Sequence, residues 1–181
     1  MQTISTILEE LTTVCSHISK KQFERLVEIF QEDRTFYFSG EGRSGLMAKA
    51  IAMRLMHGGK KVHVIGETTT PAIVENDVLI ILSGSGKTAQ TVHIGQSAAK
   101  AGASVFLVTT NREALESPWV QDGLLIPAAT KHRLPDEPNT IQPLGNQFDQ
   151  SAHIVLDAAI IDSLQSASLQ EEMKKKHSNL E

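Results

Sequence analysis

Six consecutive residues of this chain combine hydroxyl side chains with glycines: Ser83, Gly84, Ser85, Gly86, Lys87 and Thr88. A phosphate monoester has several oxygens to satisfy, and hydroxyls, backbone N–H groups and a helix N-terminus together form a site for such an anion. The segment resembles the end of the P-loop motif G-x-x-x-x-G-K-[ST], but Ile81 stands where the first glycine is required. We therefore expect the three hydroxyls to bind a phosphate, with Gly84 and Gly86 allowing close backbone approach. Capping of the following helix would explain one of the hydroxyls but not all three.

A second glycine-rich segment precedes it: Gly40, Glu41, Gly42, Arg43, Ser44 and Gly45. Alone it matches G-x-G-x-x-G, and Glu67 follows 22 residues after Gly45, where a dinucleotide-binding protein places the acid that binds the ribose. This alternative stays open on the segment alone. It leaves the hydroxyl-rich segment unexplained and offers no separate substrate domain.

Short apolar runs alternate with longer amphipathic segments along the chain. The predicted strands are 35–38, 61–65, 78–82, 104–108 and 123–126. The predicted helices are two within the first thirty-odd residues, then 46–56, 88–100, 113–120, 144–164 and 169–177, with an exposed loop at 128–139. Such alternation is typical of an α/β fold with a parallel sheet, in which ligands bind at the carboxyl ends of the strands. Both glycine-rich segments follow predicted strands and should meet there.

The length of 181 residues fits one domain, which we divide into an N-terminal helical segment (1–33), the sheet with its loops (34–140) and C-terminal helices (141–181). A net charge of −4 disfavours a nucleic-acid partner. A single cysteine provides no disulfide framework, and no apolar run reaches the ~18 residues of a membrane span. With no leader-like N-terminus, we expect a cytoplasmic protein that contacts neither membrane nor nucleic acid.

The order of the motifs resembles a known family. A strand followed by G-x-G-x-S and a later strand followed by S-x-S-x-x-T are the signature of SIS (sugar isomerase) domains, and the likeness is greatest to the 6-phospho-3-hexuloisomerases. It extends over the segments 42–45, 48–50, 53–57, 66–71, 141–145 and 177–181. The resemblance implies a flavodoxin-like five-stranded parallel sheet and reversible conversion of D-arabino-3-hexulose 6-phosphate to fructose 6-phosphate. It also implies an oligomer, usually a tetramer, with shared active sites and with no metal or organic cofactor.

Isomerisation through an enediol needs a phosphate anchor, a base and groups that polarise the carbonyl. By the resemblance, the phosphate contacts are Ser44, Ser83, Ser85 and Thr88. Arg43 would stabilise oxyanion charge, or form a surface ion pair. Glu67 would contact sugar hydroxyls or transfer a proton, or be an ordinary loop carboxylate.

Asp149 stands where the family usually has Glu, one methylene longer. We expect it to be the base, although an acid in the first turn of a helix is also favoured by the helix dipole. By the resemblance, His177 would reach an active site, that of a neighbouring subunit, and open the sugar ring or shuttle a proton. Glu41 and Lys87 also depart from the family, and their opposite charges would compensate each other if they met across the pocket mouth.

Three other functions remain open from the sequence. The nearest is an aldose–ketose isomerase that acts on another sugar phosphate. A phosphosugar sensor without catalysis is a second, although the N-terminal helices contain no basic recognition helix. The third is the dinucleotide-binding oxidoreductase.

Overall fold

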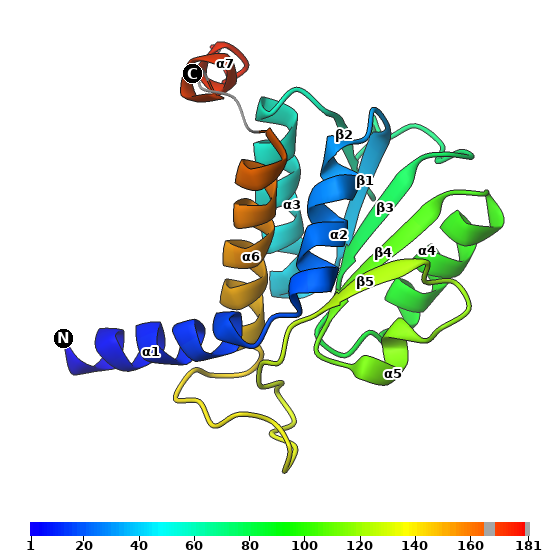
Figure 1. Ribbon diagram of the computed structural model, residues 1–181. Coiled ribbons are helices and arrows are strands. Elements are labelled where there is room, and N and C mark those ends of the chain that lie inside the picture. Colours follow the sequence, from blue (N-terminus) through cyan, green and yellow to red (C-terminus); the bar gives the residue numbers. More distant parts are fainter. Residues whose placement is uncertain (165–168, 180–181) are drawn as a thin grey trace.

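The computed structural model describes residues 1–164 and 169–179, and its centre is a five-stranded parallel sheet (Figure 1). The strands are β1 (Thr35–Gly40), β2 (Lys61–Val64), β3 (Val78–Leu82), β4 (Ser104–Thr109) and β5 (Asp122–Leu125). Their order is β2-β1-β3-β4-β5. The strand order therefore reverses between β1 and β3, the switch point at which open α/β sheets bind ligands. The predicted flavodoxin-like sheet is confirmed.

Helices cover both faces of the sheet. They are α1 (Gln2–Ser16), α2 (Lys20–Gln31), α3 (Gly42–His57), α4 (Ala89–Lys100), α5 (Arg112–Leu115), α6 (Asn146–Leu164) and α7 (Leu169–Lys175). Helices α2, α3 and α6 pack on one face, and α4 and α5 on the other (Figure 1). Because every residue of β3 is buried, its continuous apolar run has the central position that the sequence predicted.

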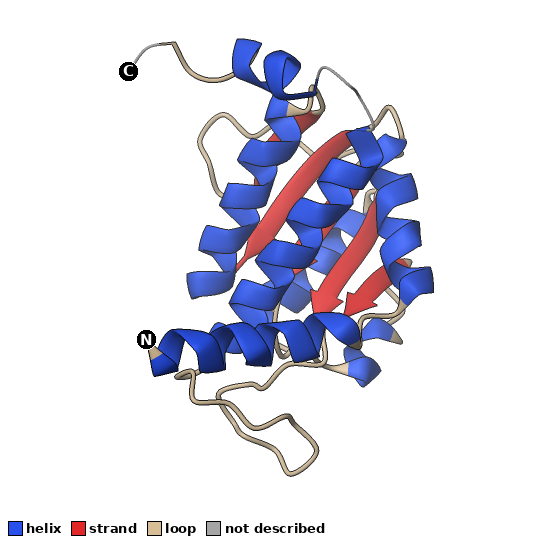
Figure 2. Ribbon diagram, turned by 60° about the vertical axis from the view of Figure 1, so that its left-hand side comes forward, coloured by secondary structure: helices blue, strands red, loops and turns tan. Residues whose placement is uncertain are grey.

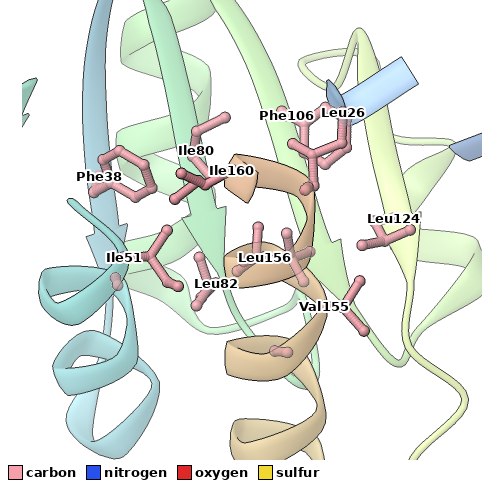
Figure 3. Packing of buried hydrophobic residues seen from close by; sticks show 14 of the residues in the cluster. Leu26, Phe38, Ile51, Ile80, Leu82, Phe106, Leu124, Val155, Leu156 and Ile160 are labelled. Carbon is pink, nitrogen blue, oxygen red and sulfur yellow. The ribbon is translucent and has the colours of Figure 1, made fainter. Parts of the chain in front are cut away.

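Side chains of the strands alternate between two cores. Ile80 and Leu82 point into the core beneath α3 and α6, whereas Leu79 and Ile81 point into the core beneath α4. Figure 3 shows the larger core, in which side chains of α2, α3 and α6 meet those of four strands: Leu26, Ile51, Val155, Leu156 and Ile160 facing Phe38, Ile80, Leu82, Phe106 and Leu124. This packing fixes the starts of α3 and α6 near the carboxyl ends of β1 and β3.

Helix α1 packs on the body of the molecule only through its C-terminal part. It contacts α6 and buries Leu11 and Val14, whereas its N-terminal part projects away from the body and exposes Ile4 and Leu8 (Figures 1 and 2). In Figure 2 it crosses the molecule beside the loop that joins β5 to α6. Within the described residues, every helix is too short or too polar to span a membrane.

Many element boundaries differ from the sequence prediction by one or two residues, and three larger or more informative differences have a physical reason. Helix α3 begins at Gly42 rather than 46, so the second glycine-rich segment is mostly the first turn of this helix. Helix α5 ends at Leu115 because Ser117-Pro118 follows, and proline disfavours helix at itself and at the residue before it. Helix α6 begins at Asn146, since Leu144 has the left-handed φ of 52°.

Candidate active site

A cavity of about 350 Å³ opens at the carboxyl ends of β1 and β3, within the size range of small-molecule sites. Four parts of the chain form its wall: the turn from β1 into α3, the β3–α4 loop, the segment 130–132 and the start of α6. Its lining includes six of the predicted site residues or loop glycines: Arg43, Ser44, Gly84, Ser85, Thr88 and Asp149. The two glycine-rich segments, whose nearest lining residues Ser44 and Gly84 are 40 positions apart in the sequence, thus meet in one pocket, as the strand-end argument predicted.

Asp149 is a nearly buried carboxylate in the wall of this cavity, its side chain 6% exposed. Ser44 Oγ donates a 2.8 Å hydrogen bond to Asp149 Oδ1, and Arg43 Nε lies 3.5 Å from Oδ2. Burial raises the pKa of Asp149, while the hydrogen bond from Ser44 and the Arg43 charge partly oppose that shift. A fixed carboxylate with raised pKa is more basic than an exposed one, which suits a group that accepts a proton from carbon.

In the β3–α4 loop, the hydroxyl of Ser83 lies inside the turn, whereas Ser85 and Thr88 line the cavity. Ser83 is buried, and its Oγ accepts a 3.1 Å hydrogen bond from Gly86 N, so Ser83 shapes the turn and is not among the lining residues. Thr88 is the N-cap residue of α4, yet its side chain makes no capping hydrogen bond. Ser85 and Thr88 line the cavity beside the free N–H groups of the first turn of α4, an arrangement that favours an anion.

The last residue of β4 and the two residues after it hold this loop in place. The hydroxyls of Thr109 and Thr110 both donate to the carbonyl of Gly84 at 2.9 Å, and Asn111 Nδ2 donates to the carbonyl of Ser85 at 3.0 Å. Lys87 Nζ bonds to Glu113 at 2.9 Å, so its partner is Glu113 rather than Glu41. The loop is therefore fixed in place without any substrate.

The β5–α6 connection contributes a part of the site that the sequence analysis did not identify. Thr130, Lys131 and His132 line the cavity, although the region was predicted only as an exposed loop. Glu10 of α1 holds the end of this connection, since its carboxylate accepts hydrogen bonds from Thr140 Oγ1 (2.6 Å), Ile141 N (2.8 Å) and Gln142 Nε2 (3.0 Å). The signal that was available was its position after a strand, at the same edge of the sheet.

Glu67 and His177 lie outside this cavity in the subunit described. Glu67 pairs with Lys49 at 3.6 Å and lines a separate groove between α3 and the edge strand β2. His177 is exposed after α7 and stacks on His57 with ring centroids 5.3 Å apart. The rise of an α-helix separates Asp149 from the end of α6 by about 22 Å, and α7 lies beyond that end (Figure 1). Residues 180–181 of the resembling C-terminal segment are outside the described residues.

No group of three or more His, Cys, Asp or Glu side chains in the described part of the chain is arranged to hold a metal ion. The polar groups at the cavity are hydroxyls, backbone amides, a guanidinium, an ammonium, an imidazole and carboxylates. They suit an oxygen-rich anion.

Comparison with known proteins agrees with this geometry. The family model described as SIS domain matches residues 28–134. The chain belongs to the SIS-domain family. A 3-hexulose-6-phosphate isomerase of Bacillus subtilis is 35% identical over 179 residues, which cover 98% of this chain and 97% of the relative. A protein of the same name from Mycobacterium gastri is 36% identical over 182 residues, with 98% and 89% covered.

A solved structure extends the comparison to the backbone. The crystal structure of a hypothetical protein from Methanococcus jannaschii, described as inferring a molecular function of 3-hexulose-6-phosphate isomerase, superposes with a TM-score of 0.82. It is 25% identical and covers 100% of both chains. The resemblance to the SIS domains and to the 6-phospho-3-hexuloisomerases is thus confirmed, and the likeness spans the whole chain rather than one motif.

Proposed function

We propose that this protein is a sugar-phosphate isomerase that interconverts D-arabino-3-hexulose 6-phosphate and fructose 6-phosphate through a 2,3-enediol. One observation carries the proposal: a buried carboxylate, fixed by a hydroxyl and a guanidinium, shares a cavity with a hydroxyl loop at a helix N-terminus. The first group suits proton transfer and the second suits a phosphate. The relatives that carry the name 3-hexulose-6-phosphate isomerase support the same assignment.

Asp149 is the base of the proposed reaction. It removes the proton from C3 of fructose 6-phosphate, and the electron pair moves so that the C2 carbonyl becomes an enediol oxygen. The proton of the C3 hydroxyl passes to the C2 oxygen, and the proton held by Asp149 returns to C2, which leaves the carbonyl at C3 and produces the 3-ketose. Arg43, whose guanidinium lies beside the carboxylate, stabilises the negative charge that develops on oxygen.

The β3–α4 loop anchors the phosphate in this proposal. Ser85, Thr88 and the N–H groups at the start of α4 contact its oxygens, while Ser83 keeps the turn in shape. Ser44 takes a positioning role, since its hydroxyl donates to Asp149.

We also propose a homo-oligomer, a tetramer with shared sites. The projecting part of α1 exposes Ile4 (58%) and Leu8 (59%), and α6 exposes Ile154 and Ile161. Apolar helix faces of this kind are stabilised by burial against a partner. In such an assembly His177, which is remote from the cavity of its own subunit, would serve the site of a neighbour. Sedimentation equilibrium tests this: the double variant Ile4→Glu/Leu8→Glu should lower the molecular mass, and an unchanged oligomer would exclude α1 from the interface.

Carbon-13 NMR of the reaction mixture tests the isomerase proposal. The wild-type protein should convert labelled fructose 6-phosphate to an equilibrium mixture that contains a 3-ketose. Asp149→Asn should be slower by about 10²- to 10⁴-fold, the usual contribution of a general base. Asp157→Asn is the matched control, because Asp157 lies on the same helix but pairs with Arg54 outside the cavity. An aldose product would instead show an aldose–ketose isomerase, and binding without turnover would show a sensor.

A further inference from the structure

Five charged or titratable side chains line the cavity, and their partners differ: Glu41, Arg43, Lys131, His132 and Asp149. Arg43 is paired with Asp149. Lys131 is exposed and has neither an ion-pair nor a hydrogen-bond partner for its side chain anywhere in the described part of the chain. Lys131 is therefore a cationic residue in the cavity lining that no carboxylate in the described part of the chain neutralises.

The β3–α4 loop contributes no unpaired positive charge to the cavity. Its one charged residue, Lys87, is bonded to Glu113 at 2.9 Å and is not among the lining residues. A phosphate monoester has a charge of about −1.5 to −2 at neutral pH. Hydroxyls and backbone amides donate hydrogen bonds to the phosphate oxygens, but they compensate only part of the phosphate charge. The carboxylates of Asp149 and Glu41 in the same cavity repel that charge.

The backbone on both sides of Lys131 is held while its side chain is free. Thr130 N donates to Glu137 Oε2 at 2.9 Å, and Thr130 Oγ1 donates to Glu137 Oε1 at 2.6 Å. Arg133 Nη1 donates to the carbonyl oxygen of Leu144 at 2.8 Å, which ties the loop to the start of α6. The backbone of the loop thus keeps Lys131 in the lining of the cavity before any ligand arrives.

We propose that Lys131 binds the phosphate group of the substrate. Its positive charge would add to the hydrogen bonds that the β3–α4 loop donates to the same phosphate. The inference rests on the proposed function for the identity of the substrate, but the phosphate contact itself does not require catalysis. It assigns a binding residue to the β5–α6 connection, a part of the chain that lacks the glycine and serine motifs of the other two loops.

Lys131→Met tests the contact, because methionine keeps an unbranched side chain and removes the charge. With fructose 6-phosphate as substrate, KM should rise by about 10- to 100-fold, the value of a hydrogen bond to a charged group, while kcat changes by less than about threefold. The inhibition constant of inorganic phosphate should rise by a similar factor. Lys131→Arg should recover most of the loss. Lys100→Met is the matched control, since Lys100 is an exposed lysine at the far end of α4 and its removal changes the net charge equally.

Calorimetric titration with inorganic phosphate separates this inference from the proposed function. If the wild-type protein binds phosphate and Lys131→Met binds it much more weakly, Lys131 is the anchor even where fructose 6-phosphate is not isomerised. Equal phosphate affinity in the wild type and in Lys131→Met overturns the inference, as does a wild-type protein that binds no phosphate. A fall in kcat with unchanged KM also overturns it, because the ammonium would then act on the reacting carbons instead.

Discussion

Gly86→Ala should destabilise the protein more than Gly42→Ala, although both glycines have a left-handed backbone. Gly86 has φ of 63° in the β3–α4 loop, and Gly42 has φ of 56° at the start of α3. A Cβ atom added at Gly86 would lie 2.5 Å from Ala114 Cβ, whereas one added at Gly42 would meet no atom within 4 Å. Both substitutions therefore place an alanine in an unfavourable left-handed backbone conformation. Only the alanine at position 86 also has too little space for its Cβ atom.

The magnitudes follow from these two contributions. A non-glycine residue in the left-handed region costs about 1 to 2 kcal/mol, and the lower entropy of the unfolded chain offsets about 0.4 to 1 kcal/mol of it. Crowding in a packed site adds about 1 to 3 kcal/mol at Gly86 only. For a chain of this length, that difference lowers the melting temperature of Gly86→Ala by about 2 to 12 °C relative to Gly42→Ala.

Differential scanning calorimetry of the two variants and the wild-type protein measures the difference directly. Gly86→Ala should melt lowest, and it should also bind inorganic phosphate more weakly, because relief of the contact with Ala114 moves the loop. Equal melting temperatures for both variants would refute the reasoning, since they would mean that the loop moves without cost and is not a rigid anchor.

Three further perturbations test the surroundings of the site. Ser44→Ala removes a hydrogen bond to the Asp149 carboxylate that is worth about 1.5 to 3 kcal/mol. The pKa of Asp149 should rise further, so the acid limb of the pH profile of kcat/KM should move to higher pH, and an unmoved limb would show another base. Partial burial raises the pKa of Glu10, but its hydrogen bonds outweigh this and leave the pKa lowered. The stability that Glu10 contributes at neutral pH should be lost as pH falls through that lowered pKa, and Glu10→Gln should remove this loss in acid melting curves. Burial and the neighbouring basic side chains lower the pKa of His57 in the folded protein. As pH falls below about 6.5, the unfolded chain therefore binds a proton at this histidine before the folded protein does. Protonation then favours the unfolded chain, and the free energy of unfolding decreases. The variant His57→Gln should lack that decline in chemical denaturation.

The sheet was predictable because each strand has a local signal. The run 78–82 is apolar throughout and lies in the centre of the sheet, where helices bury both of its faces. The glycine and hydroxyl residues that follow β1 and β3 showed where the pocket must be, since parallel strands bring their carboxyl ends to one edge. Asp149 was identified through the family resemblance, and the structure places it beside Ser44 and Arg43.

The remaining parts depend on contacts between distant segments, which no local pattern encodes. Lys131 was overlooked because a lysine in a polar, proline-containing loop has no periodicity, and its place at the cavity depends on Glu137 and Arg133. Ser83 has the same residue type as Ser85, but only the fold shows that Ser83 is buried within the turn whereas Ser85 lines the cavity. The prediction for His177 concerns a second subunit and remains a prediction.

Deuterium exchange during turnover tests the central claim most directly. Fructose 6-phosphate would be incubated in D₂O with the wild-type protein and with Asp149→Asn, and proton NMR would follow each carbon-bound proton. The account predicts that the wild-type protein exchanges the C3 proton as a 3-ketose forms, and that Asp149→Asn does so far more slowly. Exchange at C1, or exchange at C3 at the wild-type rate in Asp149→Asn, would contradict it.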